Sequence, residues 1–366
     1  MAVYLVGYAG IGITALITGQ VASKTNKKTF LITAFCIMVL IAGFRSQNVG
    51  ADTPSYLAIF DFLQNNSIGE AKAVFTTIET GYLVFVKCLT FFTNSKQVFL
   101  IVQAIVIYFS IGRFILRYSD DAYIATLFFY ALSFTTTMNI MRQWIALSIL
   151  LFTFEFLDKK KYFNVICLLM LAITFHKSAI VFGAVIVAYT LKEKKRFSIC
   201  CAIAGIAMCL VLNSSAFDNI LVAVGYSRIV NSRWMEGAQS NGTMAYIYFL
   251  ICALDLIVIA LTKKREVANG KAFPVTQYRF CQKKFYLLMS ILGAYTNYLA
   301  RINAAMSRFG LYFLVFMFFV FSDAIERICR LVGMRWRILF NYIVYVLLAF
   351  ACMISAGGYR YEFLIK

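Results

Sequence analysis

Long apolar runs recur along the chain from Val3 to Ile354, and they constrain the fold more than any other feature. An α-helix needs roughly 20 apolar residues to cross about 30 Å of hydrocarbon, and the runs have about that length. Inside a bilayer a helix satisfies its own backbone hydrogen bonds. With 62% hydrophobic and 14% charged residues, the 366-residue chain is predicted to be an all-α polytopic integral membrane protein.

Basic clusters between the apolar runs predict the topology. The net charge of +19 is spread over short clusters, which is typical of cytoplasmic loops and argues against nucleic-acid binding. We assign the clusters at 24–28, 159–161, 192–196, 263–265 with 283–284, and 327–337 to the cytoplasmic side, which places both termini outside. About twelve transmembrane helices follow, at 3–19, 30–45, 97–116, 122–138, 142–157, 162–175, 177–191, 197–213, 245–262, 285–300, 309–325 and 338–356.

The remaining segments complete a single transmembrane domain over residues 1–366. Two outer-face loops, 46–80 and 213–244, are too short to form a separate domain. The apolar segment 81–95 is expected to be interfacial or re-entrant, because a full crossing there would reverse the side of every later loop. Asp255 and Lys87 fall within apolar stretches, so each should have a buried partner or face a cavity.

Several classes of site are disfavoured by what the chain lacks. The ten cysteines lie almost entirely within apolar runs and show no metal-type spacing, and the single histidine, His176, excludes a His-rich metal site. The loops contain no Walker-type phosphate loop, which argues against ATP-driven work. We therefore expect no metal and no cofactor.

The first polar stretch after the second apolar run, residues 44–56, has the pattern of a turn followed by a helix. Gly50 permits a tight turn. Thr53 is a favoured N-cap and Pro54 suits the first helical position. Apolar residues then follow at helical spacing and predict one buried face of a short surface helix: Tyr56, Ile59, Phe60 and Leu63.

Arginines on the predicted outer face run against the positive-inside tendency. A planar guanidinium binds phosphate oxygens in a bidentate way, so these residues favour an anionic lipid substrate that carries pyrophosphate. The alternative is that each arginine snorkels to water or pairs with a lipid head group. The set comprises Arg45, Arg142, Arg228, Arg233, Arg301, Arg308 and Arg360.

Two pairs of these arginines predict local arrangements. Arg301 and Arg308 are seven residues apart and would share a face if that stretch is one helix. Arg228 and Arg233 lie beside Tyr226 and Trp234, whose rings suit either stacking on sugars or the aromatic belt of a membrane interface.

His176 and the outer carboxylates are the candidates for proton transfer. His176 falls near the predicted outer surface, where it could be a hydrogen-bonded structural residue, a donor to phosphate or a base. A general base for a sugar hydroxyl would come from Asp52, Asp61, Glu70, Glu79, Asp218 or Glu236. Asp52 is nearest in sequence to an arginine, but it could equally cap a helix or pair with Arg45.

Four motifs in sequence order carry a family resemblance. They are Arg45 with Val49-Gly50-Ala51-Asp52-Thr53 and Tyr56, then Glu79-Thr80-Gly81-Tyr82, then Arg142-Gln143 with Ala146, and Phe175-His176-Lys177-Ser178-Ala179. Together they resemble the EpsG family of bacterial polysaccharide proteins, which is related to Wzy-type polymerases of O-antigen and capsule. Arg301 and Arg308 resemble the less distinctive second half of that family, whereas the loop 213–244 matches no motif.

The resemblance implies a glycosyltransferase-C-like membrane bundle and a processive glycosyltransferase of the bacterial inner membrane, with its site facing the periplasm or outside. It would join oligosaccharide units carried on undecaprenyl pyrophosphate, without nucleotide sugar or metal. The implied partners are this lipid-linked oligosaccharide, membrane lipids and a chain-length regulator, with no nucleic acid.

The residue roles expected on this basis divide into two groups. Arg142, Arg301 and Arg308 would hold pyrophosphate, His176 would position or neutralise it, and Asp52 or Glu79 would be the base. The other substrate-binding candidates are Arg45, Tyr56, Gln143, Arg228 and Arg233.

Two other classes of function remain open from the sequence. A flippase or transporter of the same lipid-linked oligosaccharide would also need a cationic cavity, although it would often show two related halves, and no internal repeat is evident. The second class is a polysaccharide O-acyltransferase in which His176 would be the base. A requirement for an acyl donor would distinguish it from a polymerase.

Overall fold

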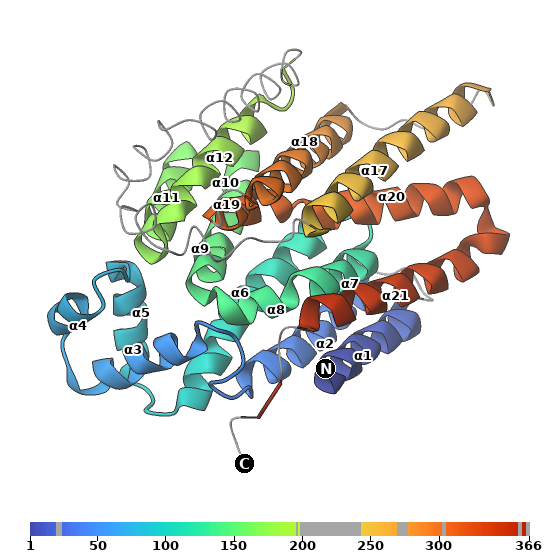
Figure 1. Ribbon diagram of the computed structural model, residues 1–366. Coiled ribbons are helices and arrows are strands. Elements are labelled where there is room, and N and C mark those ends of the chain that lie inside the picture. Colours follow the sequence, from blue (N-terminus) through green and yellow to red (C-terminus); the bar gives the residue numbers. More distant parts are fainter. Residues whose placement is uncertain are drawn as a thin grey trace. The chain divides into compact units, whose positions relative to one another are not determined.

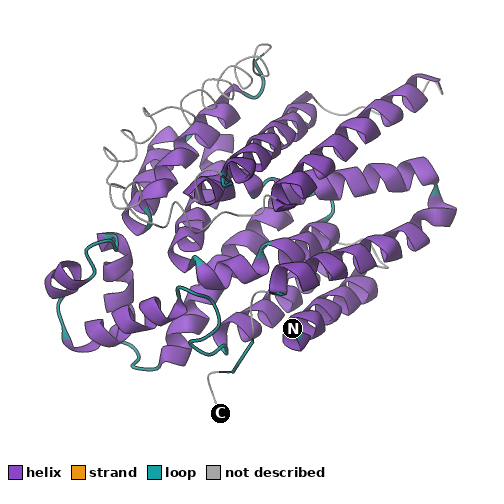
Figure 2. Ribbon diagram, viewed as in Figure 1, coloured by secondary structure: helices purple, strands orange, loops and turns teal. Residues whose placement is uncertain are grey.

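The described part of the chain is built from helices in the computed structural model (Figures 1 and 2). The structure describes residues 1–19, 24–194, 197, 243–268, 277–301, 305–357 and 361–363. Among these residues no strand is drawn, and the one extended pairing is an isolated antiparallel bridge between Arg45 and Phe363. The all-α prediction is therefore confirmed for this part of the chain.

Five helices in the described residues are long and apolar enough to cross a membrane. They are α1 (Ala2–Gly19), α2 (Lys24–Gly43), α6 (Lys96–Tyr118), α17 (Thr243–Ala268) and α21 (Met334–Ala356). The pair α19 (Ala305–Leu314) and α20 (Met317–Val332) would make a sixth, bent by 48°. These helices are consistent with a polytopic membrane protein, whereas the number of twelve spans is not confirmed.

Three predicted spans are interrupted, so their expected continuity was wrong. The span 122–138 is α7 (Ala122–Leu132) followed by α8 (Phe134–Asn139), 142–157 is α9 (Met141–Leu151) followed by α10 (Thr153–Asp158), and 309–325 falls on α19 and α20. At each of the first two breaks a threonine hydroxyl donates a hydrogen bond to the backbone carbonyl three residues earlier. Thr136 donates to Ser133 at 2.7 Å beside the first break, and Thr153 donates to Leu150 at 2.6 Å beside the second. Such bonds compete with the helix ladder and bend it.

The chain divides into two compact units, Met1–Ala179 with Val332–Lys366, and Ile180–Leu331. The shorter apolar helices α11 (Tyr162–Phe175) and α12 (Phe182–Leu191) fall in the first and second unit respectively. The expectation of a single transmembrane domain stays a prediction.

In the first unit α2 and α6 lie antiparallel. A Cβ on Gly43 would be 3.2 Å from the Ile101 backbone, a Cβ on Gly112 would be 2.7 Å from the Phe35 ring, and Lys27 donates to the carbonyl of Asp120 at 3.2 Å. The basic residues at the start of α2 therefore lie beside the end of α6. Gly43 and the loop after it lie beside the start of α6, at the opposite end of the unit.

The core of this unit is aromatic. Every residue of α7 except Tyr123 is buried, as expected of a helix that is apolar all round. Tyr130 stacks on Phe134 with ring centroids 4.6 Å apart, and its hydroxyl donates to the carbonyl of Tyr4 at 2.9 Å. Trp144 of α9 packs edge-on against Phe129 at 5.9 Å. α7 and α9 thus pack against each other through aromatic side chains.

Three short helices follow the first polar loop: α3 (Thr53–Asn65), α4 (Ile68–Val74) and α5 (Thr80–Thr90). The predicted buried face of α3 is confirmed, because Tyr56, Ile59, Phe60 and Leu63 are all buried. The predicted cap is wrong by one residue: Asp52 is the N-cap and Thr53 already lies in the helix.

α5 has 11 residues and is about 16 Å long, shorter than the hydrocarbon thickness of a bilayer. Lys87 of this helix has partners in the protein, one of them the buried Leu63, as expected. Its ammonium donates to the carbonyls of Leu63 and Asn66 at 2.7 and 3.0 Å, where a cation also complements the dipole at the end of α3.

In the second unit α18 (Gln277–Leu299) packs closely against α19. A Cβ on Gly293 would lie 2.9 Å from the backbone of Leu314, so a larger residue would separate the two helices. Asp255 of α17 is 4% exposed, and its Oδ1 atom has no hydrogen-bond partner among the described residues. The partner that we expected for Asp255 is thus not found for that oxygen.

Candidate functional site

Glu79 is the centre of a buried ionic cluster at one end of the first unit. Its Oε2 atom accepts a hydrogen bond from a terminal guanidinium nitrogen of Arg142, and its Oε1 atom accepts one from the backbone N–H of Lys177 at 3.1 Å. The Nδ1 atom of His176 lies 3.3 Å from the same Oε1 atom. The Glu79 and His176 side chains are each 8% exposed. The cluster therefore joins three of the four sequence motifs.

Close helix packing brings these groups together. Glu79 is the N-cap of α5, Arg142 lies in the first turn of α9, and His176 follows the last residue of α11. A Cβ on Gly81 would lie 2.7 Å from the carbonyl oxygen of Thr174, closer than any real contact. Glycine at this position lets α5 approach α11 closely enough for Glu79 to reach His176.

The cluster keeps Glu79 ionised. Burial raises the pKa of its carboxyl, but His176, the Arg142 guanidinium and the Lys177 N–H outweigh burial and lower the pKa to about 2. A carboxylate with so low a pKa is a weak base. Its geometry suits a counter-ion that orients Arg142 and His176, as a buried aspartate orients the histidine of a catalytic triad.

Tyr56 and Asp52 lie next to the cluster. Burial raises the pKa of the Tyr56 hydroxyl, the nearby Arg142 guanidinium lowers it, and the Asp52 carboxylate raises it. The ring of Tyr56 packs against Tyr82 at 5.8 Å, and the Arg142 guanidinium lies 6.0 Å from the Tyr82 ring centre.

The side chain of Asp52 makes neither of the contacts considered from the sequence. It forms no capping hydrogen bond to α3, and it forms no ion pair with Arg45 or any other described residue. Asp52 is partly exposed. Its carboxylate is therefore open to a ligand.

Arg45 is not placed as a substrate ligand would be. It is 1% exposed and donates to the carbonyls of Ala42 and Met138, near the ends of α2 and α8, and to the sulfur of Met141 at 2.9 Å. Its Nε atom has no hydrogen-bond partner among the described residues. Helix C-terminal carbonyls carry partial negative charge, so Arg45 ties helix ends together. Gln143, also expected at the substrate, is 2% exposed.

Lys177 is a site residue that we did not predict, although it stands in the fourth motif. Its backbone N–H is fixed by Glu79, while its side chain is exposed and forms no hydrogen bond or ion pair with any described residue. Because Arg142 and Glu79 neutralise each other, Lys177 is the cation of this cluster whose charge is not compensated. The sequence feature that could have identified Lys177 is its position directly after His176.

The second unit holds Arg301 and Arg308. Arg301 is exposed, donates to the hydroxyl of Tyr246 at 3.1 Å and lies 5.5 Å from the ring centre of Tyr298. Arg308 lies in α19 and is partly buried. α18 ends at Leu299 and α19 begins at Ala305, so the continuous helix that would place both arginines on one face is not observed. Whether these two arginines meet the Glu79 cluster stays a prediction.

Arg228, Arg233 and Arg360 lie outside the described residues, as does all but the last two residues of the loop 213–244.

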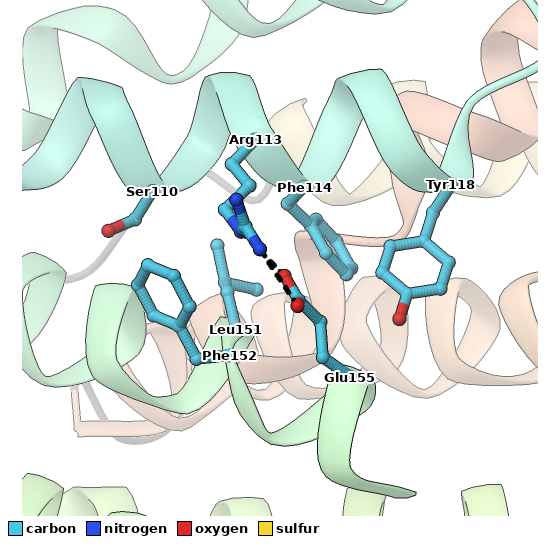
Figure 3. A pocket seen from close by; sticks show the side chains of 7 residues that line it. All are labelled: Ser110, Arg113, Phe114, Tyr118, Leu151, Phe152 and Glu155. Atoms are coloured by element: carbon cyan, nitrogen blue, oxygen red, sulfur yellow. Dashed lines mark hydrogen bonds and ion pairs between the residues drawn. The ribbon is translucent and has the colours of Figure 1, made fainter. Parts of the chain in front are cut away.

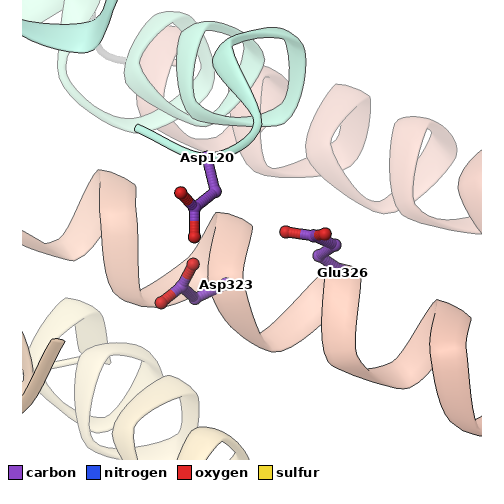
Figure 4. Close-up of side chains that lie close together, drawn as sticks. All are labelled: Asp120, Asp323 and Glu326. Atoms are coloured by element: carbon purple, nitrogen blue, oxygen red, sulfur yellow. The ribbon is translucent and has the colours of Figure 1, made fainter. Parts of the chain in front are cut away.

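The acidic side chains of α20 have basic partners. Asp323 accepts from the ammonium of Lys283 at 3.1 Å, and Glu326 pairs with Arg330 one turn further along the helix. Figure 4 shows both carboxylates on α20.

A small surface cleft lies at the end of the first unit opposite the Glu79 cluster. Figure 3 shows Arg113 of α6 and Glu155 of α10 facing each other in it, with nitrogen–oxygen distances of 2.5 and 2.8 Å. Arg117 also approaches Glu155, at 3.4 Å. This ion-pair network lies next to the basic cluster at 159–161 and joins helices far from the Glu79 cluster.

The fold and the cluster define a class of protein: a membrane-embedded helical protein with a buried ionic site at one end of its first unit. The chain belongs to the EpsG family, whose family model matches residues 28–363, and this is a Wzy-like polymerase family. The resemblance found in the sequence is thereby confirmed. Membership suggests a glycosyltransferase-like polymerase in polysaccharide biosynthesis. No curated protein matches the chain, and no solved structure does.

Proposed function

We propose that this protein is a polysaccharide polymerase that joins oligosaccharide repeat units carried on undecaprenyl pyrophosphate, at the outer face of the bacterial cytoplasmic membrane. Family membership supports the reaction class. One observation supports the location of the site: Glu79 contacts Arg142, His176 and Lys177, so that residues of three motifs far apart in sequence meet.

The reaction exchanges one bond to the anomeric carbon for another. A hydroxyl of one lipid-linked unit attacks the anomeric carbon of the growing chain, and the bond from that carbon to the pyrophosphate oxygen breaks. A base takes the hydroxyl proton, and the lipid pyrophosphate leaves with the bonding electron pair. The pyrophosphate already activates the donor, so the step needs no nucleotide. Catalysis must stabilise the negative charge on the leaving group.

His176 and Lys177 are the groups that we assign to the leaving pyrophosphate. The Nδ1 atom of His176 lies 3.3 Å from Oε1 of Glu79, so the carboxylate orients the imidazole, which titrates near neutral pH and could interact with a phosphate oxygen. The exposed ammonium of Lys177 supplies a positive charge that no described carboxylate cancels. Arg142, paired with Glu79 and 15% exposed, contributes a fixed guanidinium beside them.

Asp52 is the general base in this proposal. Both oxygens of Glu79 are occupied and its pKa is about 2, so Glu79 is poorly suited to accept a proton. Asp52 has a partly exposed carboxylate with no ion-pair partner among the described residues, and it is close enough to Tyr56 to affect the pKa of that hydroxyl. The attacking sugar hydroxyl would approach Asp52 from the exposed side of its carboxylate.

Within the second unit, Arg301 is proposed as a residue that binds a sugar phosphate. It lies between two tyrosines, Tyr246 and Tyr298, whose rings are 6.0 Å apart and nearly perpendicular. An exposed guanidinium beside aromatic rings suits a sugar phosphate, because the cation binds the phosphate and a ring packs on the sugar face. Arg308, Arg228 and Arg233 remain candidates for the same role.

The test is polymerisation by the purified protein in vesicles containing lipid-linked repeat units and no nucleotide. Longer lipid-linked chains are expected with the wild type. Asp52→Asn should lower the rate by about 100-fold or more. Lys177→Met and Arg301→Ala should each lower it by roughly 10- to 100-fold. Lys161→Met, an exposed lysine at the other end of the first unit, is the matched control and should leave the rate unchanged.

No chain growth by the wild type without nucleotide would overturn the reaction class. Wild-type rates in both Asp52→Asn and Lys177→Met would leave the reaction possible but exclude the Glu79 cluster as its site.

A further inference from the structure

We propose that the C-terminal segment at Tyr361–Phe363 is a positioning element for the loop 44–52, which leads into α3 and carries Asp52. The catalytic consequence of this contact rests on the proposed function, whereas the contact itself can be tested without activity. Glu362 is the positioning residue, since it touches the loop and none of the groups assigned to the substrate.

Glu362 binds the first half of the loop through both its backbone and its side chain. Its carbonyl accepts from the backbone N–H of Ser46 at 2.7 Å, and its Oε2 atom accepts from the side-chain amide of Asn48 at 2.8 Å. The Ser46 hydroxyl lies 3.5 Å from the same Oε2 atom. Next to these contacts, Arg45 and Phe363 form the antiparallel bridge.

Tyr361 anchors the segment to the bundle. Its hydroxyl donates to the carbonyl of Ile41, in the last turn of α2, at 2.9 Å. Its ring packs edge-on against Tyr4 of α1, with centroids 5.7 Å apart. Tyr361 thus contacts both α1 and α2 of the first unit. These contacts fix the position of the segment beside the loop.

The second half of the loop is fixed by α8. Gly50 has a φ of +89°, and a Cβ there would lie 2.6 Å from the carbonyl oxygen of Met138. The backbone N–H of Asp52 donates to the side chain of Asn139 at 3.1 Å, and the Thr53 hydroxyl donates to Val49 at 2.7 Å. The loop has no helix or strand of its own, so its conformation depends on these contacts, on the buried Arg45 and on Glu362.

Loss of the Glu362 carboxylate should therefore loosen the first half of the loop. The amide of Asn48 would lose its acceptor, and the stretch from Asn48 to Asp52 would be held by the α8 contacts and by the anchor at Arg45. Because substrate-binding groups are untouched, the rate of turnover should fall while the apparent KM for the lipid-linked unit changes little.

Hydrogen–deuterium exchange of the full-length protein in detergent tests the contact directly. Glu362→Ala should speed amide exchange in residues 44–52 by about five- to tenfold, the effect of losing one hydrogen bond. Glu362→Gln keeps an acceptor for Asn48 and should restore slow exchange. Asp61→Asn removes another exposed carboxylate, on α3, and should leave the loop unchanged.

Unchanged exchange of residues 44–52 in Glu362→Ala would overturn the proposal. In the polymerisation assay, Glu362→Ala should lower kcat by roughly threefold to tenfold, and Glu362→Gln should restore it. If exchange responds to Glu362 while Asp52→Asn polymerises normally, the loop contact stands and the assignment of Asp52 as the base fails.

Discussion

At the scale of single residues, the burial of a charge separates groups that organise the site from groups that can meet a substrate. Glu79 and Arg45 are both buried, and their hydrogen bonds go to other protein groups. Asp52 and Lys177 lie beside them with side chains that reach solvent. The sequence could name all four residues as polar positions, but it could not say which of them were enclosed.

A double-mutant cycle on Arg142 and Glu79 tests the buried pair. Arg142→Gln should destabilise the protein by about 3–5 kcal/mol, because it leaves the Glu79 carboxylate buried without its guanidinium partner. Adding Glu79→Gln should recover part of that loss, with a coupling of about 1–3 kcal/mol. Thermal unfolding in detergent measures the stability, and polymerisation should stay low in all three variants.

The exposed pair Arg113 and Glu155 is the matched control for that cycle. The Arg113 side chain is 47% exposed, so its coupling to Glu155 should be below about 1 kcal/mol and polymerisation should persist. Equal couplings for the two pairs would show that burial does not strengthen the Arg142–Glu79 contact.

The lowered pKa of Glu79 predicts a stability change in acid. Its carboxyl has a pKa of about 2 in the folded protein against 4.5 without the fold, so its contribution is fully present above pH 4.5 and is lost as the pH falls towards 2. The contribution is of the order of 3 kcal/mol at most. The melting temperature of the wild type should exceed that of Glu79→Gln at pH 7, and the difference should shrink below pH 4.5. A constant difference from pH 7 to pH 3 would contradict the lowered pKa.

At the scale of elements, the site depends on how closely two short helices approach. α5 carries Glu79 and α11 leads into His176, and they meet where Gly81 faces Thr174. The same approach is supported by the ring contact between Phe85 and Phe175, with centroids 5.9 Å apart, and by the hydrogen bond from the Lys177 backbone to Glu79.

Gly81→Ala should therefore separate Glu79 from His176. Forcing a methyl group into this contact should cost about 1–3 kcal/mol and lower polymerisation by at least tenfold. Gly69→Ala is the matched control, since a Cβ there meets nothing closer than the Ser67 hydroxyl at 3.9 Å in the exposed helix α4. That change should keep activity and raise stability by about 0.5–1 kcal/mol. Normal polymerisation by Gly81→Ala would show that close approach of α5 to α11 is not needed.

At the scale of the molecule, the first unit has two chemically different ends. Basic residues at the start of α2 and after α10 lie at the end that carries Arg113 and Glu155. The Glu79 cluster and the C-terminal segment lie at the other end. Two clusters that were assigned to the cytoplasm independently thus lie on the same side, which supports the proposed outer position of the site.

Labelling with a membrane-impermeant thiol reagent tests this orientation in cells. In a variant whose ten cysteines are replaced by serine, Asn65→Cys on α3 should be labelled in intact cells. Lys159→Cys, after α10, should be labelled only once the membrane is permeabilised. The reverse pattern would place the Glu79 cluster inside the cell and exclude a reaction on outer lipid-linked units.

The sequence by itself determined the helical membrane architecture and the family, because apolar length and basic loops are local properties and the motifs lie in order along the chain. It also marked Asp52, Glu79, Arg142, His176 and Arg301 as catalytic candidates. Tertiary structure alone decided that Glu79 is a counter-ion, that Arg45 ties helix ends, and that Tyr361 and Glu362 support the first polar loop. Apart from the contact of Arg45 with Ala42, those roles depend on pairs separated by 63 to 320 residues, whose contact is set by packing rather than by any local pattern.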